Sequence, residues 1–248
     1  MKVFALSDLH LSFQTDKPMN VFGEKWDNYE DRIKQNWNLK VCADDIVIVA
    51  GDISWAMNIS ETQKDFEYIG SLAGKKVMVR GNHDYWWKAI STVRETVPNS
   101  IYAIQNDALK LGNFIFCGTR GWLVPERGKE LSAEDKKIYN RELIRLEMAL
   151  SRATELKTDA DKIICVLHFP PFNSELEDNE FTNLIEKYNI KTVVYGHLHG
   201  KTKYPTNLIE KNGVKYYLSS CDKIGFSPIL IDENSPELFN SSVEFVVD

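Results

Sequence analysis

Val77-Met78-Val79-Arg80-Gly81-Asn82-His83-Asp84 runs from a short, mostly apolar stretch into a glycine and three polar side chains. The apolar residues predict a buried strand, and the polar residues predict where that strand ends. Amide, imidazole and carboxylate groups can each bind a metal ion or a proton. The stretch therefore predicts a functional loop at the carboxyl end of a buried strand.

The same order, an apolar run followed by polar residues or glycine, occurs four more times in the chain. The other predicted strands are Val3 to Leu6, Ile46 to Ala50, Ile163 to Leu167 and Thr192 to Tyr195. The segments that follow them are Asp8-Leu9-His10, Gly51-Asp52, His168 and Gly196-His197-Leu198-His199. All five histidines of the chain lie in these segments and the first stretch. Ligands of open α/β sheets bind beyond the carboxyl ends of the strands, so we expect these residues to converge.

Helical spacing and turn signals predict the elements between and after these strands. Two helices are predicted in the first half, one where Trp26, Tyr29, Ile33 and Trp37 recur at helical spacing, and one where Phe66, Ile69 and Leu72 lie between a Ser60-x-x-Gln63 capping box and Gly74. Two more are predicted in the second half, from the Ser132-x-x-Asp135 cap to about Leu156 and from Phe181 to Tyr188. Hairpins are predicted around Gly112-Asn113 and around Lys211-Asn212-Gly213. Parallel units and antiparallel hairpins thus coexist. No repeat or linker divides the chain, and we expect one domain over residues 1–248.

Composition narrows the functional class. Of the 248 residues, 43% are hydrophobic and 27% are charged, which is typical of a folded globular protein. The net charge of −6 disfavours binding to nucleic acid and to anionic lipid. The start of the chain does not resemble a signal peptide, and no stretch approaches the roughly 20 apolar residues of a membrane span. We therefore expect a cytoplasmic protein.

The four cysteines are far apart and form no C-x-x-C pair. They are Cys42, Cys117, Cys165 and Cys221. Buried free thiols are the expected state, with disulfide or metal-binding roles as the alternatives.

Taken in order, the five polar segments resemble the motifs of the calcineurin-like metallophosphoesterase superfamily. Those motifs are D-x-H, G-D, G-N-H followed by E or D, a single H, and G-H-x-H, and the resemblance spans residues 8 to 199. Aspartate at position 84 makes the third motif most similar to that of the small bacterial phosphodiesterase-type members. The resemblance implies the metallophosphoesterase fold, an α/β architecture of two mixed β-sheets packed as a sandwich with helices on the outer faces.

The resemblance also implies a centre with two divalent metal ions, for which Mn, Fe and Zn are candidates. Asp8, His10 and His199 would bind one ion, Asn82, His168 and His197 the other, and Asp52 would bridge them. Physical reasoning agrees, because imidazole, carboxylate and amide oxygen without thiolate suit Mn, Fe, Zn or Co. Two cations about 3.5 to 4 Å apart also need a shared anion to offset their repulsion.

His83 follows a ligand motif without being a ligand in the family. There it faces the substrate as a general acid or as a phosphate-binding cation, with the aspartate corresponding to Asp84 holding its imidazole. The alternative for Asp84 is the N-cap or first-turn acid of a helix over Tyr85 to Thr96.

Aromatic and basic residues next to the motifs are candidates for substrate binding. Three aromatic segments belong either to the core or to a wall of the substrate cleft: Trp55, Trp86-Trp87 and Phe169-Pro170-Pro171-Phe172. Trp55 is our candidate for the cleft. Arg120, flanked by Gly118 and Gly121, either grips a phosphate or forms a surface salt bridge.

These observations predict a hydrolase of phosphomonoesters or phosphodiesters, in which a metal-bridging hydroxide attacks phosphorus and His83 acts as general acid. The expected partner is a small phosphorylated substrate, without nucleic acid, membrane or an obligate protein partner. The alternatives are a non-catalytic metal-binding or scaffold protein, simple metal storage, and a protein phosphatase. Protein phosphatases of the superfamily carry an arginine shortly after the second motif and glutamate in the third, unlike Ile53-Ser54-Trp55 and Asp84 here.

Overall fold

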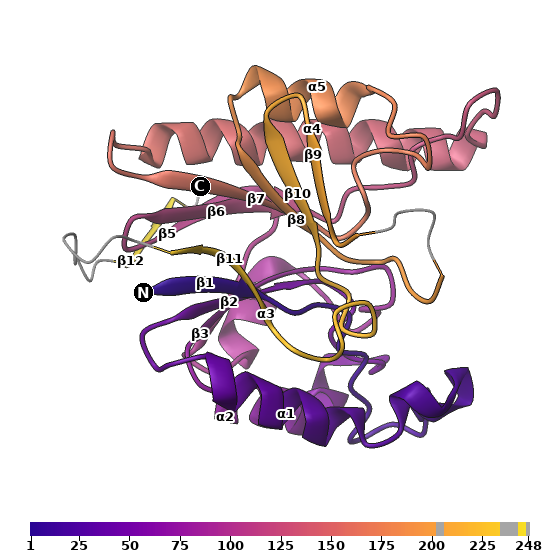
Figure 1. Ribbon diagram of the computed structural model, residues 1–248, viewed down its shortest axis with the longest axis vertical. Helices are drawn as coiled ribbons and strands as arrows, with labels where there is room; N and C mark the ends of the chain where they lie inside the picture. The colour runs from indigo at the N-terminus through magenta and orange to yellow at the C-terminus, as the bar shows by residue number, and fades with distance from the viewer. Residues whose placement is uncertain (202–205, 234–242, 247–248) are drawn as a thin grey trace.

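Two β-sheets pack face to face in the middle of the molecule, and helices cover the outer face of each sheet (Figure 1). The structure is a computed structural model that describes residues 1–201, 206–233 and 243–246. The expected fold class, two mixed sheets in a sandwich with outer helices, is confirmed.

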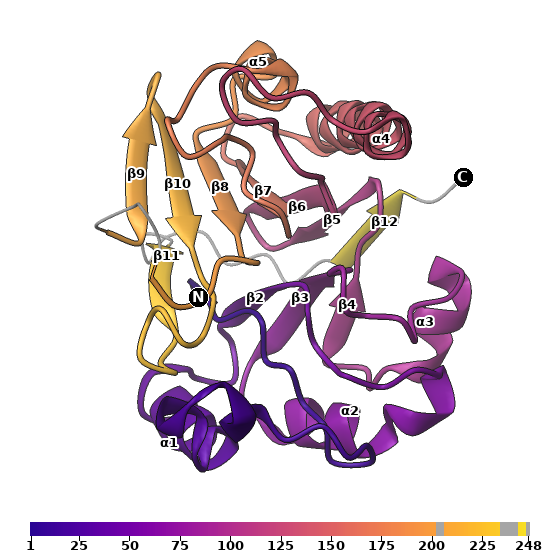
Figure 2. The ribbon, with the colours of Figure 1, turned by 90° about the vertical axis from the view of Figure 1, so that its right-hand side faces the viewer.

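The first sheet is built mainly from the N-terminal part of the chain. Its strands are β1 (Lys2–Ala5), β2 (Ile46–Ala50), β3 (Lys75–Val79), β4 (Ile101–Ala103) and β11 (Ile229–Glu233), in the order β11-β1-β2-β3-β4. Strands β1, β2, β3 and β4 are parallel to one another, and β11 is antiparallel to β1. The outer face carries α1 (Tyr29–Lys40), α2 (Gln63–Ser71) and α3 (Ile90–Thr96), as Figure 2 shows. Three short 3-10 helices, η1 (Met19–Phe22), η2 (Glu24–Trp26) and η3 (Ile59–Glu61), lie in the same part of the chain.

The second sheet comes mainly from the C-terminal part. Its strands are β5 (Asp107–Leu111), β6 (Phe114–Thr119), β7 (Lys162–Leu167), β8 (Thr192–Tyr195), β9 (Leu208–Lys211), β10 (Val214–Leu218) and β12 (Val243–Val246), in the order β12-β5-β6-β7-β8-β10-β9. Strands β6, β7, β8 and β10 are parallel to one another. The pairs β12-β5, β5-β6 and β10-β9 are antiparallel. Helices α4 (Ala133–Leu156) and α5 (Glu180–Lys187) cover its outer face (Figure 2).

The alternation of side chains along β2 shows how the layers are held together. Ile46, Ile48 and Ala50 belong to the core between the two sheets, whereas Val47 and Val49 belong to the core under α1, α2 and α3. Both faces of the strand are therefore buried, and each face contributes apolar area to a different core. This double burial explains why the strand is a continuous apolar run in the sequence.

Most elements that the sequence predicts are confirmed, and three helix starts are wrong. The first predicted helix includes Trp26, but α1 begins at Tyr29 and Trp26 lies on η2. The box predicted at Ser60 and Gln63 is instead formed by Asn58 and Glu61 at η3, and α2 begins at Gln63. The helix predicted from Tyr85 begins only at Ile90.

The late start of α3 has a packing cause. Trp86 and Trp87 are adjacent in sequence, yet both are buried in the core under the first sheet. Adjacent residues of a helix point about 100° apart, so a helical turn would send one of the two indoles toward solvent. The preceding loop therefore stays irregular.

Two further expectations concern membrane spans and thiols. None of the helices among the described residues has the length and apolar character needed to traverse a bilayer. All four cysteines are free, and Cys117, Cys165 and Cys221 are buried as expected. Cys42 is exposed, contrary to expectation, because it lies in the turn between α1 and β2 rather than in a strand.

Candidate metal centre

The loops after β1, β2, β3, β7 and β8 meet at one edge of the sandwich. Parallel pairing brings the carboxyl ends of β1, β2 and β3 to the same edge of the first sheet, and those of β7 and β8 to the same edge of the second. Hydrogen bonds join the two sets of loops. The backbone N–H of His197 donates to both carboxylate oxygens of Asp8 (2.9 and 3.1 Å), and the His168 ring bonds Ala50 O (2.9 Å). The structure thus brings together segments separated by up to 189 residues.

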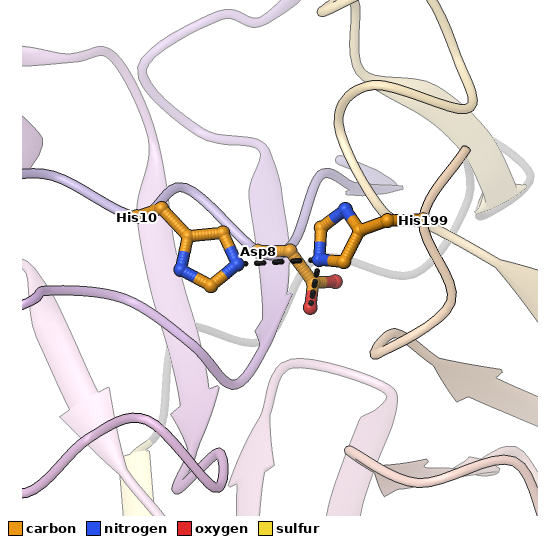
Figure 3. A group of neighbouring side chains, drawn as sticks. All are labelled: Asp8, His10 and His199. Carbon is orange, nitrogen blue, oxygen red and sulfur yellow. Dashed lines mark hydrogen bonds and ion pairs between the residues drawn. The ribbon is translucent and has the colours of Figure 1, made fainter. Parts of the chain in front are cut away.

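One group of possible ligands consists of Asp8, His10 and His199 (Figure 3). Their ligand atoms all lie within 4.8 Å of one another. The Nε2 atoms of His10 and His199 are 3.2 Å apart, and His199 Nε2 is 3.6 Å from Asp8 Oδ1. Three donor atoms from both sheets therefore face a common point.

A second group consists of Asp8, Asp52 and His168, with ligand atoms within the same 4.8 Å limit. His168 Nε2 also lies 2.6 Å from Asn82 Oδ1, which in turn is 2.9 Å from His197 Nδ1. The carbonyl of Ala50 only accepts, so His168 Nδ1 carries the hydrogen and the neutral ring presents a lone pair at Nε2. Burial lowers the pKa of His168, which favours this neutral form. The Nε2 lone pair of His168 and the amide oxygen of Asn82 therefore face each other, and a cation bound by both atoms would offset their repulsion.

Asp52 lies between the two groups. Its Oδ2 is 3.5 Å from His168 Nε2 and 3.8 Å from His10 Nε2, while Oδ1 accepts a hydrogen bond from the His83 backbone N–H (2.8 Å). Burial, together with the nearby charges of Asp8 and Asp84, raises the pKa of Asp52 well above its ordinary value. A cation on either side would relieve this repulsion, so the position suits a shared ligand.

Four of the seven expected ligands have a left-handed backbone conformation. Asp8, His10, Asp52 and His197 have φ angles of 57°, 46°, 50° and 70°. Such a conformation costs a non-glycine residue about 1 to 3 kcal/mol and persists where the surrounding structure enforces it. The surrounding contacts of this edge therefore fix the direction of the donor side chains.

Two glycines allow the ligand loops to approach one another. A Cβ atom at Gly81 would lie 2.1 Å from both the backbone N and Oδ1 of Asp52, and one at Gly196 would lie 2.4 Å from Asp8 Oδ2. Any side chain at these positions would displace the neighbouring carboxylate. These two glycines thus leave room for the carboxylates of Asp52 and Asp8.

Comparison with protein families agrees with this geometry. The model of the family described as calcineurin-like phosphoesterase matches residues 1–201. The chain belongs to this family. The segment matched contains all the motif residues, from Asp8 to His199.

A solved structure shares the fold of this calcineurin-like phosphoesterase at low sequence identity. Phosphopantetheinyl hydrolase from Mycobacterium tuberculosis is 16% identical, with a TM-score of 0.52 over 88% of each chain. A protein of unknown function from Aquifex aeolicus is 15% identical, with a TM-score of 0.48 over 92% of this chain and 95% of its own. No curated protein matches the sequence.

Asp84 does not hold the imidazole of His83, contrary to the expectation from the resemblance. Its oxygens accept hydrogen bonds from the N–H groups of Ile53 (2.8 Å), Ser54 (3.2 Å) and Gly81 (2.7 Å) and from the Trp86 indole (3.0 Å). These donors use the acceptor capacity of the buried carboxylate. His83 Nδ1 has no hydrogen-bond partner among the described residues. In this calcineurin-like phosphoesterase, Asp84 ties the loop after β2 to the loop after β3, and it does not cap a helix.

Asp222 contacts the centre and was not among the residues singled out in the sequence. Its Oδ1 lies 2.8 Å from His199 Nδ1, and its Oδ2 accepts hydrogen bonds from Gly200 N (3.0 Å) and Lys25 Nζ (2.5 Å). Burial by itself would lower the pKa of His199, but the hydrogen bonds and charges of Asp222 and Asp8 outweigh it and raise this pKa to about 10. Asp222 follows β10, a strand that the sequence assigned to a hairpin, so the order of strand and polar residue did not mark it as part of the site.

An aromatic cavity adjoins the first ligand group. It has a volume of about 470 Å³ and is lined in part by Trp26, Trp55, His10, His83 and His199. The Trp55 ring stacks on His10, with centroids 4.9 Å apart, and lies 4.6 Å from the ring of His83. Of the aromatic candidates, Trp55 thus faces the cleft, whereas Trp86 and Trp87 belong to the core.

Arg120 lies at the end of β6, beside the loop that carries His168. Its backbone carbonyl accepts hydrogen bonds from His168 N (3.0 Å) and Phe169 N (2.9 Å). Its guanidinium lies over the Trp122 ring, 4.4 Å from the centroid, and burial lowers its pKa to about 10. Its Nε atom has no hydrogen-bond partner in the described part of the chain.

Proposed function

We propose that this calcineurin-like phosphoesterase hydrolyses a phosphoester with the help of two divalent metal ions. The observation that carries the proposal is the position of Asp52, whose Oδ2 faces His10 of one donor group and His168 of the other. Family membership and the two donor groups support a metal-dependent hydrolase. We assign Asp8, His10 and His199 to one ion, Asn82, His168 and His197 to the other, and the bridge to Asp52.

The donor set fits such ions in chemical type, and two of its imidazoles are in the protonation state that binds metals. Burial lowers the pKa values of His10 and His197 to about 3, so both rings are neutral, which is the form that binds metals. Imidazole, carboxylate and amide donors suit Mn, Fe or Zn. Two such ions, when bound, supply a nucleophilic hydroxide at neutral pH and stabilise negative charge on the phosphoryl oxygens.

His83 is the proposed proton donor to the leaving group. Its half-buried ring lines the aromatic cavity beside Trp55, and its Nδ1 has no partner among the described residues. Burial and the neighbouring His168 and His199 lower the pKa of His83. A bound phosphate anion would counter that effect and favour the protonated ring.

Arg120 and Trp55 are the proposed substrate contacts. In the described residues Arg120 forms no ion pair, so the surface salt bridge considered as its alternative is not observed. A partly buried guanidinium beside the His168 loop is suited to bind a phosphate oxygen. Trp55 offers an aromatic face to an organic group of the substrate.

The proposed partner is a small phosphorylated molecule, and the proposed location is the cytoplasm. Cys117 and Cys165 are register partners on β6 and β7, and both are buried free thiols. The negative net charge supports a small substrate rather than nucleic acid.

Kinetics of a His83→Ala variant test the proposal. Manganese-loaded wild-type protein should hydrolyse p-nitrophenyl esters of phosphate. The variant should retain both metal ions by elemental analysis and lose about two to four orders of magnitude in turnover of alkyl esters. The loss should be smaller for p-nitrophenyl esters, because nitrophenolate departs without a proton. Absence of metal-dependent hydrolysis in the wild type would refute the proposal, and loss of metal in the variant would make His83 a ligand.

A further inference from the structure

Two cavities, rather than one, open onto the metal centre, and His199 lines both of them. The first, the aromatic cavity, lies on the side of His10 and His83. The second has a volume of about 310 Å³ and lies on the side of His197. We call it the leucine cavity, after Leu123 and Leu198, which line it with Phe169 and Phe172. Because proposed ligands line both cavities, a phosphate bound at the centre would lie beside both.

The aromatic cavity is suited to an organic leaving group. Its lining includes the indoles of Trp26 and Trp55, together with Lys25 and Phe22. His83 lines this cavity but not the leucine cavity. A proton donor has to lie beside the oxygen that leaves. The leaving group therefore belongs in the aromatic cavity.

The leucine cavity is suited to a second organic group. The Phe169 ring packs against the His197 imidazole, with centroids 4.1 Å apart, so an apolar wall reaches a proposed ligand. Leu123 is 45% exposed and thus presents apolar surface that nothing in the described chain covers. Glu126 and Lys201 are the charged residues among those that line the cavity. Apolar walls of this kind gain free energy when they contact carbon rather than water.

We infer that the substrate is a phosphodiester with an apolar or aromatic group on each side of the phosphate. This inference rests on the proposed function and extends it to one substrate class. A monoester has one organic group, which would occupy the aromatic cavity. The remaining phosphate oxygens would then face the leucine cavity, where they would gain nothing from contact with an apolar wall. Volumes of about 470 and 310 Å³ are adequate for a ring on each side.

In the inferred reaction, the oxygen of a water molecule bonds to phosphorus while the bond from phosphorus to the leaving oxygen breaks. The water loses a proton to solvent, and His83 gives a proton to the leaving oxygen. The alcohol departs through the aromatic cavity. The other organic group stays on the monoester product, in the leucine cavity.

A series of substrates with the same leaving group tests the inference. The probes are p-nitrophenyl phosphate, methyl p-nitrophenyl phosphate and phenyl p-nitrophenyl phosphate, assayed with manganese-loaded protein. The expected kcat/KM is highest for the phenyl diester, about tenfold or more above the methyl diester, and lowest for the monoester. A monoester rate equal to or above both diester rates would overturn the inference and leave the proposed function intact. Hydrolysis of none of the three would overturn the proposed function itself.

A matched pair of leucine variants locates the effect. Leu123→Ser removes apolar surface from the leucine cavity, and Leu39→Ser removes it from an 83% exposed position on α1 that lines neither cavity. We expect Leu123→Ser to lower kcat/KM for the phenyl diester about fivefold, with little change for the methyl diester. Leu39→Ser should change neither. Equal losses for both diesters in Leu123→Ser would overturn the placement of the retained group.

Discussion

The Nδ1 atom of His199 lies 2.8 Å from Oδ1 of Asp222, a carboxylate whose side chain is fully buried. This hydrogen bond turns the ring so that Nε2 faces Asp8 and His10 (Figure 3). A carboxylate behind a histidine ligand fixes its orientation and makes the ring a stronger base. In the proposed metal centre, Asp222 would therefore position the ring of His199.

Replacement of Asp222 by asparagine should weaken metal binding without unfolding the protein. We expect affinity at the site of Asp8, His10 and His199 to fall about tenfold, within the range known for such partners. Competition with a chelator would measure it. The control is Asp178→Asn, a 60% exposed carboxylate paired with Lys211, which should bind metal like the wild type. Unchanged affinity in Asp222→Asn would contradict the positioning role.

Metal binding should release protons and strengthen as pH rises. In the metal-free protein His199, with its pKa raised to about 10, holds a proton at neutral pH, and so does Asp52, whose pKa is raised by burial and by Asp8. Both groups have to lose a proton to bind a cation, so about two protons should leave at pH 7. Affinity should therefore fall as pH falls from 8 to 6. Calorimetry in buffers of different ionisation enthalpy would count the protons, and a pH-independent affinity would contradict the prediction.

A side chain at position 81 should disrupt the centre by displacing Asp52. The added methyl of Gly81→Ala would lie 2.1 Å from Asp52 Oδ1 and from its backbone N, which no rotamer change relieves. We expect a loss of stability of about 1 to 3 kcal/mol and poor metal retention. Gly70→Ala on α2 is the control, because its methyl would meet only the Pro98 ring at 3.1 Å. Normal metal content in Gly81→Ala would show that the loops can separate without harm.

Asp84→Ala should destabilise the protein as well as reduce its activity. The substitution leaves buried N–H groups of the loops after β2 and β3 without an acceptor, at about 1 to 3 kcal/mol each. Urea denaturation should therefore show a loss of at least about 3 kcal/mol, together with lower metal retention. If Asp84 instead served only to orient His83, its variant would keep wild-type stability and resemble His83→Ala in kinetics.

The parts of the site that the sequence predicted share one physical cause. Apolar runs with both faces buried mark the strands, and the residues after parallel strands have to meet at one edge, so Asp8, Asp52 and His168 could be placed together in advance. Asp222 could not be placed in this way. Its strand, β10, is joined by a hairpin to β9 but also pairs in parallel with β8, and this second pairing leaves no local signal in the sequence.

Local backbone geometry explains the other errors. Trp26 shares its helical spacing with Tyr29, and the sequence therefore placed both on one helix. Asn28 lies between them with a φ of 50°, which ends the regular turn and leaves Trp26 on η2 against the cavity. The family resemblance implied that Asp84 holds the His83 imidazole, but the buried carboxylate of Asp84 accepts hydrogen bonds from the loop N–H groups instead.

Both donor groups combine residues from the two sheets, and this has a consequence for the timing of biosynthesis. On a ribosome the donors of residues 8 to 82 emerge first, and those of residues 168 to 199 emerge only after the whole of α4. A nascent chain that has formed only β1 to β4 has neither donor group complete. If the proposed centre binds metal ions, we therefore expect neither candidate site to be complete before the second sheet has docked.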